Sequence, residues 1–202
     1  MSQLYQAVRA GKAILVETNE TRFLAFRDPP TQNQPTSLGV WGLGACSVVI
    51  VVSKQAVILS HIGPNVFGSE ENDSFIQLAR RKMDELERIY NEKRQLFTND
   101  SEAYVIYATL GGQVLSPEQT AIFRDRLARL ALPTLVNRAY QSPREEDVNV
   151  HRPEGQVLVE KPSNSRPMVY LEDRIISPGV GVDSRSPAQA SSSRHRPGNP
   201  GF

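Results

Sequence analysis

Gly42-Leu43-Gly44-Ala45-Cys46 runs directly into Ser47-Val48-Val49-Ile50-Val51-Val52, and this stretch decides the fold. A second apolar run, Ala56-Val57-Ile58-Leu59, follows after residues 53–55 and leads through Ser60 to His61. Both runs are short, rich in β-branched residues and free of helical periodicity, which predicts two buried strands. The brief connection between them predicts an antiparallel hairpin.

The hairpin brings the lone cysteine of the chain close to a histidine. If Ser53-Lys54 forms a two-residue turn, Cys46 lies directly opposite His61, with the Cβ atoms about 4.5–5.5 Å apart. A three-residue turn would place the two side chains on opposite faces, whereas a four-residue loop would return them to the same face along a diagonal. Ser-Lys is an unfavourable pair for a primed turn. The sequence therefore permits the Cys46–His61 pairing and leaves the register open.

Length and composition bound the class of protein. The chain has 202 residues, which predicts one α/β domain over residues 1–176 and a disordered tail over 177–202, where Pro, Gly, Ser and Arg dominate. The formal net charge is +1, so electrostatics do not favour nucleic acid as a partner. No apolar run reaches the ~18 residues of a membrane span, and residues 1–12 lack the apolar core of a secretory signal. A lone cysteine suits a reducing, cytoplasmic location.

Two principal helices are expected after the hairpin. The first, over residues 74–95, has Ser74 as its cap with Gln77 at the capping-box position. Its apolar stripe follows a three-to-four spacing and consists of Phe75, Ala79, Met83, Leu86 and Tyr90. The second, over residues 116–131, has Ser116 as its cap, Pro117 in the first turn and Gln119 at the capping-box position.

Strands account for most of the remaining pattern. Residues 13–17 and 22–27 are two short apolar runs that are expected to form a hairpin. Further strands are expected at residues 104–110, 135–140, 156–160 and 168–171. The predicted fold class is α/β, with mixed, mainly antiparallel β layers flanked by the two principal helices.

Two short motifs and the order of elements resemble the chemoreceptor glutamine deamidase family (CheD), within the wider group that includes the catalytic domain of cytotoxic necrotizing factor toxins. Residues 42–46 are similar to the Gly-Leu-Gly-Ser-Cys of that family. Residues 58–61, with Pro64 just beyond, are similar to its Gly-Gly-x-x-His segment before Leu-Pro. Residues 150–159, which include Arg152, are faintly similar to its late Arg-containing strand, and the whole resemblance covers about residues 36–160.

The resemblance implies a protein glutamine deamidase with Cys46 and His61 as the catalytic pair. Cys46 would attack the carboxamide of a glutamine side chain on another protein, and His61 would take the thiol proton and deliver it to the leaving ammonia. A protonated His61 would also lower the pKa of the thiol. The backbone N–H of Cys46 and a neighbour among Gly42, Gly44 and Ala45 would form the oxyanion hole, because glycine lets the backbone approach a ligand closely.

The sequence departs from the family at a third position. The family has Thr six residues before its cysteine, and this chain has Val40 there, with Thr36 and Ser37 further upstream. The toxin relatives are thought to orient their histidine by a main-chain carbonyl, so the loss of the Thr does not exclude the reaction. It does weaken an assignment to chemoreceptor deamidation, and the sequence does not identify what aligns His61.

Other readings of the same residues remain open. Free cysteine is among the most buried residue types, so Cys46 could be structural, and the chain would then be a non-catalytic protein-interaction domain. A redox role for Cys46 is a weaker alternative, because the chain has no second cysteine to resolve it. One cysteine and three widely separated histidines argue against a zinc site. We expect no metal or other cofactor, and a protein as substrate or partner; the oligomeric state is not indicated.

Overall fold

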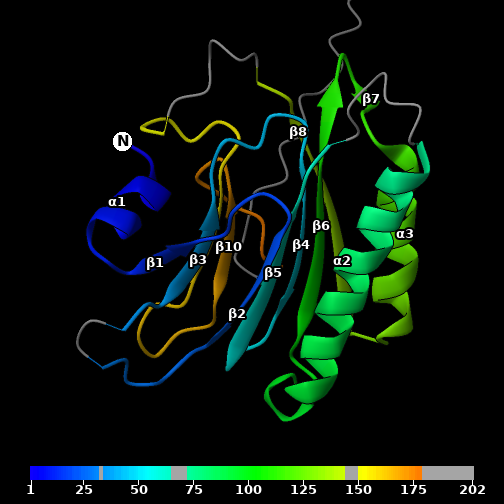
Figure 1. Cartoon of the computed structure of the whole chain (residues 1–202). Coiled ribbons are helices and arrows are strands. Elements are labelled where there is room, and N and C mark those ends of the chain that lie inside the picture. Colours follow the sequence, from blue (N-terminus) through cyan, green and yellow to red (C-terminus); the bar gives the residue numbers. More distant parts are fainter. Residues whose placement is uncertain (32–33, 65–71, 144–149, 179–202) are drawn as a thin grey trace, which may run out of the picture.

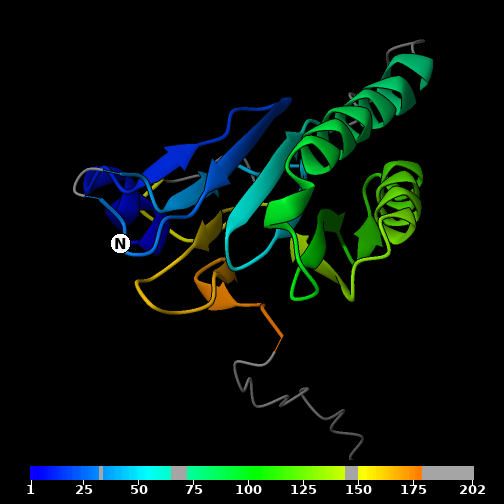
Figure 2. The same ribbon diagram turned by 90° about the horizontal axis from the view of Figure 1, so that it is seen from below.

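The structure is a computed structural model, and it describes residues 1–31, 34–64, 72–143 and 150–178. Two β-sheets lie face to face, two long helices cover the outer face of one sheet, and a short helix lies against the other (Figure 1). Seen from below, the long helices and the short helix lie on opposite sides of the pair of sheets (Figure 2). This arrangement confirms the predicted α/β class with mainly antiparallel layers.

The predicted hairpin lies in the middle of the larger sheet, which we call sheet B. Its strands run in the order β2-β5-β4-β6-β7, and β8 pairs in parallel with β6. All neighbours other than β6 and β8 are antiparallel. The strands are β2 (Glu20–Ala25), β4 (Ser47–Val52), β5 (Ala56–Ile62), β6 (Glu102–Leu110), β7 (Gln113–Val114) and β8 (Thr134–Gln141).

The second sheet, sheet A, is built from the two ends of the described chain. Its order is β1-β3-β9-β10-β11, in which only β1 and β3 are parallel. The strands are β1 (Ala13–Leu15), β3 (Ser37–Val40), β9 (Val157–Glu160), β10 (Met168–Leu171) and β11 (Arg174–Ile175). Strands β3 and β11 were not predicted, because each is too short to show a period in the sequence.

Three apolar layers hold the elements together. Side chains from both sheets fill the central layer, which includes Val48, Ile50, Leu59 and Cys46. Alternate residues of the same strands, such as Val49, point the other way and pack under the two long helices. The short helix α1 (Gln3–Arg9) covers the outer face of sheet A through Leu4. Because the central strands are covered on both faces, β4 and β5 are buried along their whole length.

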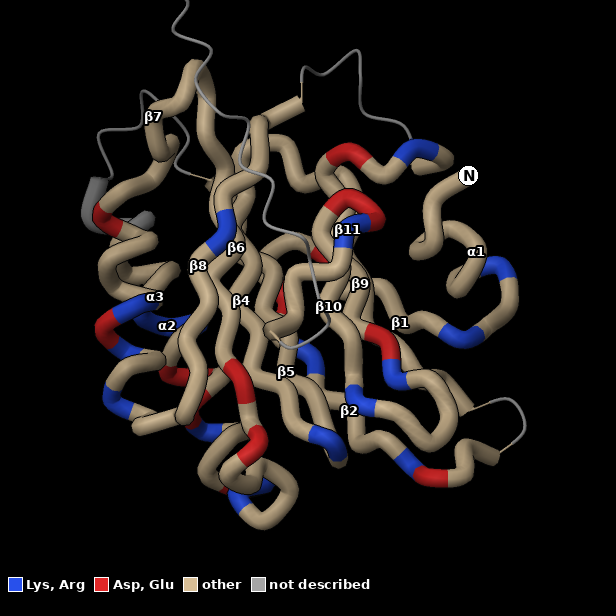
Figure 3. The backbone as a smooth tube through the Cα atoms, turned by 180° about the vertical axis from the view of Figure 1, so that it is seen from behind, with Lys and Arg blue, Asp and Glu red and all other residues tan. Residues whose placement is uncertain are grey.

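The long helices are α2 (Asn72–Glu92) and α3 (Pro117–Arg129), and a single 3₁₀ turn, η1 (Arg94–Leu96), follows α2. The stripe expected on α2 is confirmed at four described positions that are all buried against sheet B, namely Ala79, Met83, Leu86 and Tyr90. Charged residues of both signs occur on the two helices (Figure 3), as expected for solvated helix faces.

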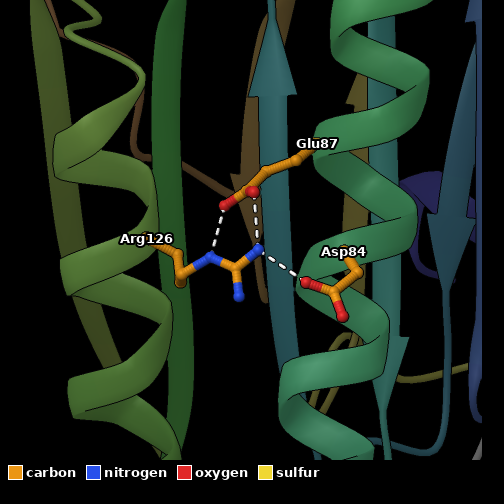
Figure 4. A network of polar contacts seen from close by, with 3 residues as sticks. All are labelled: Asp84, Glu87 and Arg126. Atoms are coloured by element: carbon orange, nitrogen blue, oxygen red, sulfur yellow. Dashed lines mark hydrogen bonds and ion pairs between the residues drawn. The ribbon is translucent and has the colours of Figure 1, made fainter.

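An ion-pair network joins the two long helices. Arg126 on α3 donates from Nε and Nη2 to the two carboxylate oxygens of Glu87 on α2, at 2.6 and 2.5 Å, and Nη2 also reaches Asp84 at 2.7 Å (Figure 4). The Arg126 and Glu87 side chains are each 22% exposed. The forked geometry is the strong form of an Arg–carboxylate contact. It fixes α3 against α2 at the level of this turn.

The expected hairpin between residues 13–17 and 22–27 is wrong. Strand β1 pairs with β3 in sheet A, whereas β2 pairs with β5 in sheet B. Between them the chain crosses from one sheet to the other and turns at Asn19, whose φ is +62°. The two apolar runs therefore cover different layers, which a local pattern does not distinguish.

The predicted cap of α2 is wrong, whereas the predicted cap position of α3 and Pro117 in its first turn are confirmed. Helix α2 begins at Asn72, so Ser74 lies inside its first turn. Ser116 does occupy the N-cap position of α3, but its side chain makes no capping hydrogen bond. Gln119 is fully buried, and its Nε2 donates to the carbonyl of Gly63 at 3.5 Å. A tertiary contact at the end of β5 has replaced the local cap.

The register of β4 and β5 corresponds to the four-residue loop. Val52 lies opposite Val57 and Val48 lies opposite His61, so the direct pairing of Cys46 with His61 is wrong. The hydroxyl of Ser53 explains the wider turn, since it accepts hydrogen bonds from the N–H groups of Gln55 and Ala56 at 3.1 Å each. Cys46 is therefore offset by two residues from the position opposite His61, and this even offset keeps both side chains on one face.

The predicted tail over 177–202 lies outside the described residues except for its first two positions. Ser177 is 7% exposed and accepts a hydrogen bond from the N–H of Val169 at 2.8 Å. It therefore still packs with sheet A. Within the described residues, no helix is both long enough and apolar enough to cross a membrane.

Candidate functional site

Cys46 and His61 lie on the same face of the β4–β5 hairpin, between the two sheets. His61 stands opposite Val48, and Cys46 precedes β4 by one residue, so the two are diagonal neighbours. Val48 belongs to the central apolar layer together with Cys46. The exposed fraction is 7% for Cys46 and 3% for His61. The structure thus brings the predicted pair to one place, almost out of contact with solvent.

The imidazole of His61 is held by a main-chain carbonyl. Its Nδ1 lies 3.1 Å from the carbonyl oxygen of Val16. A carbonyl oxygen only accepts, so Nδ1 carries the proton and, in the neutral ring, Nε2 keeps its lone pair. Nε2 is buried and has no hydrogen-bond partner among the described residues, so it does not bond to Cys46 Sγ in this state. The ring is oriented as a base with its accepting nitrogen free.

The backbone around His61 is fixed by the crossing between the sheets. The N–H of Asn19 donates to the carbonyl of His61 at 2.8 Å, and the side-chain oxygen of Asn19 accepts from the N–H of Gly63 at 2.9 Å. The N–H of Val16 donates to the carbonyl of Gly39 in sheet A at 2.9 Å. One short connection therefore holds both the side chain and the main chain of His61.

The loop that carries Cys46 turns at one of its two glycines. Gly42 has φ +70°, a conformation that other residues rarely adopt. Gly44 does not have a positive φ, and an added Cβ would meet no atom within 4 Å. The expected conformational need for glycine therefore applies to Gly42 and not to Gly44. The N–H of Gly44 closes the turn by donating to the carbonyl of Gly42 at 2.7 Å.

Strand β8 and the residue after it hold the carbonyl groups of this loop. The Tyr140 hydroxyl lies 2.5 Å from the carbonyl oxygen of Leu43 and 2.6 Å from that of Cys46. The Ser142 hydroxyl donates to the carbonyl of Gly44 at 2.7 Å. Tyr140 is 3% exposed. Among the described residues, none accepts a hydrogen bond from the N–H of Ala45 or Cys46. These are the donors that an oxyanion hole at Cys46 would need.

Burial opposes the ionisation of both members of the pair. It raises the pKa of the Cys46 thiol to about 11. It also lowers the pKa of His61 below its ordinary value, although the hydrogen bond to Val16 and the charge of Glu17 act in the opposite direction. The resting pair is therefore a neutral thiol and a neutral imidazole. The thiolate–imidazolium pair expected from the sequence is not the form that this buried environment favours.

None of the upstream candidates supplies a polar third side chain to the pair. Val40 is an apolar residue of β3 that is fully buried in the same apolar layer as Cys46. Ser37 lies at the opposite end of β3, where it pairs with Glu160, and Thr36 precedes it. The carbonyl of Val16 occupies the orienting role instead, and no side chain at that position signals it. Tyr140 was predicted only as part of a strand, because its partners are 94 and 97 positions away in the sequence.

The described part of the chain offers no metal site beside the pair. Among the described residues, no three His, Cys, Asp or Glu side chains gather closely enough to hold a metal ion. No protein-family model matches the chain, and no curated protein matches it. The similarity to CheD and the toxin domains therefore rests on the two short motifs and the order of elements alone.

Proposed function

We propose that the chain is a cysteine-dependent amidohydrolase that deamidates a glutamine side chain of another protein, with Cys46 as nucleophile and His61 as general base. The orientation of His61 carries this proposal. The imidazole of His61 is buried, with Nδ1 fixed on Val16 and Nε2 without a partner among the described residues. Packing alone would favour an apolar side chain at this position, because a buried nitrogen without a hydrogen-bond partner lowers stability. A base that must accept a thiol proton needs that arrangement.

The reaction starts from the neutral pair. Nε2 of His61 takes the proton of the Cys46 thiol as Sγ forms a bond to the amide carbon. The resulting oxyanion would accept hydrogen bonds from the N–H groups of Ala45 and Cys46. The carbon–nitrogen bond breaks, and His61 passes its proton to the leaving ammonia. Water then cleaves the thioester, which releases a glutamate side chain and restores the thiol.

Alkylation of Cys46 by iodoacetamide across a range of pH tests the proposal. If burial alone governs the thiol, the rate follows an inflection near pH 11. If His61 accepts the proton, the wild-type profile lies at lower pH, and His61→Ala lowers the rate at pH 7 by about 10² or more. His151→Ala is the matched control, since it removes a histidine that packs against Tyr5 on α1. The proposed enzymatic function would be refuted if the wild-type and His61→Ala profiles coincide, with an inflection near pH 11.

Ammonia release provides the second readout. Wild-type protein, Cys46→Ser and His61→Ala are incubated with glutamine-rich proteins, and ammonia is measured by a coupled assay. Release by the wild type alone identifies the reaction.

A non-catalytic protein-interaction domain is the second candidate. The low exposure of Cys46 favours this candidate. Two clefts of about 520 and 660 Å³ also favour it, because they lie at the other end of the sandwich from Cys46 and share Lys161 in their lining. A Cys46 thiol that does not react with iodoacetamide in the folded protein would favour this second function.

A further inference from the structure

The hydroxyl groups of Tyr140 and Ser142 bond to three of the carbonyl groups in the loop of Cys46. Tyr140 Oη has a single proton, which it shares between the carbonyls of Leu43 and Cys46 at 2.5 and 2.6 Å. Ser142 Oγ lies 2.7 Å from the carbonyl oxygen of Gly44. Tyr140 lies near the end of β8 and Ser142 directly follows that strand, which is anchored to β6 along eight residues.

These contacts set the direction of the loop's N–H groups. A peptide unit is planar and trans, so its N–H points away from its carbonyl. Ser142 fixes the carbonyl of Gly44, and it thereby fixes the N–H of Ala45. Tyr140 fixes the Leu43–Gly44 unit and the Cys46–Ser47 unit through their carbonyls. The Ala45–Cys46 unit, which carries the N–H of Cys46, is therefore held between two fixed units. With these carbonyls engaged, the N–H groups of Ala45 and Cys46 donate to none of the described residues.

We propose that Tyr140 and Ser142 are positioning residues that hold the Cys46 loop by its carbonyls, so that the N–H groups of Ala45 and Cys46 face the oxyanion of the reaction. The proposal rests on the proposed function. Neither residue touches the reacting atoms. Their contribution is to the geometry of two donors, and a misplacement of about 1 Å in such a site lowers the rate by about 10².

Two reagents separate donor geometry from thiol reactivity. Iodoacetamide forms a carbon–sulfur bond by displacement of iodide and develops no oxyanion. With p-nitrophenyl acetate, the thiolate adds to the ester carbonyl, an oxyanion forms, and p-nitrophenolate leaves as the thioester forms. The ratio of the acylation rate to the alkylation rate therefore reports the oxyanion donors, independently of how exposed or how ionised the thiol is.

We expect Tyr140→Phe and Ser142→Ala each to lower this ratio by about tenfold to 10²-fold. Tyr104→Phe is the matched control, because it also removes a buried tyrosine hydroxyl from the central layer, where its partner is Glu102. Its ratio should equal that of the wild type. A merely structural loss would change both rates together and leave the ratio constant, which would overturn the proposal. If Tyr140→Phe does not fold, the half-buried Ser142→Ala decides the question.

Amide hydrogen exchange keeps this proposal separate from the proposed function. The loss of the Tyr140 hydroxyl should accelerate exchange at Leu43 and Gly44, whose N–H groups donate to the carbonyls of Gly155 and Gly42, by about tenfold relative to Tyr104→Phe, because local opening follows the lost contacts. If wild-type Cys46 reacts with neither reagent, the proposed enzymatic function is wrong. Faster exchange in the variants would still show that Tyr140 and Ser142 hold the loop. Unchanged exchange in both Tyr140→Phe and Ser142→Ala overturns the positioning role, whatever the reactivity of Cys46.

Discussion

Replacement of His61 by leucine should cost little stability at neutral pH and should make the protein more resistant to acid. The side chain is 3% exposed and makes one hydrogen bond, to Val16, while its other nitrogen has no partner. Leucine removes the unsatisfied nitrogen, which relieves about 1–3 kcal/mol, and leaves the Val16 carbonyl without its donor, which costs a similar amount. The two effects oppose each other, so the free energy of unfolding at pH 7.5 should stay within about 2 kcal/mol of the wild type.

The dependence on pH has a definite sign. Burial lowers the pKa of His61 in the folded protein below its ordinary value of 6.5. Between the folded and unfolded pKa values the unfolded chain binds more protons, so stability is complete above about pH 6.5 and falls as the pH decreases toward the folded pKa. One proton corresponds to at most about 1.4 kcal/mol per pH unit. His61→Leu removes this slope, and the stability difference between the two proteins should shift in favour of the variant below pH 6.5.

Urea denaturation of both proteins from pH 5 to 8 measures the difference. All other ionisable groups are common to both proteins, so their contributions cancel in the stability difference. A stability difference that stays constant over this range would show that His61 titrates normally, and the account of a buried neutral base would be wrong.

Four further substitutions probe the frame of the site. Arg126→Ala should lower the free energy of unfolding by about 1 kcal/mol, less at high salt, since its contact with Glu87 is forked but partly exposed; urea titrations at two salt concentrations check this. Ser53→Ala should cost about 1–3 kcal/mol, because two N–H groups of the β4–β5 turn lose their acceptor, as thermal denaturation would show. Gly42→Ala should cost about 1–2 kcal/mol in the left-handed conformation, whereas Gly44→Ala should change stability by less than about 0.5 kcal/mol; equal costs in chemical denaturation would contradict the assigned turn.

The layers could be predicted from the sequence because the residues that form them repeat along the chain. The valine-rich runs of β4 and β5 show that both faces are buried, and the stripe on α2 shows which side meets the sheet. The register of β4 and β5 was harder to predict, because the Ser53 hydroxyl widens the turn by accepting hydrogen bonds from two N–H groups. A serine at the start of a tight turn is a usable signal for such a contact.

The site was predictable only in part, because half of it is main chain. Cys46 and His61 could be selected by residue type and separation. The carbonyl that orients His61 belongs to Val16, and any residue there would supply the same group. Tyr140 depends on a parallel crossover through α3, so only the folded chain shows that it meets the loop of Cys46.

Val16 links the two sheets through a single residue, with its N–H bonded to Gly39 in sheet A and its carbonyl bonded to His61 in sheet B. The orientation of the imidazole therefore depends on a residue bonded to sheet A, whereas the backbone of His61 belongs to sheet B. A small sliding of the sheets against each other would turn the base relative to the thiol without any change in either residue. Substitutions anywhere in the central apolar layer should then alter the chemistry of the pair through alignment alone.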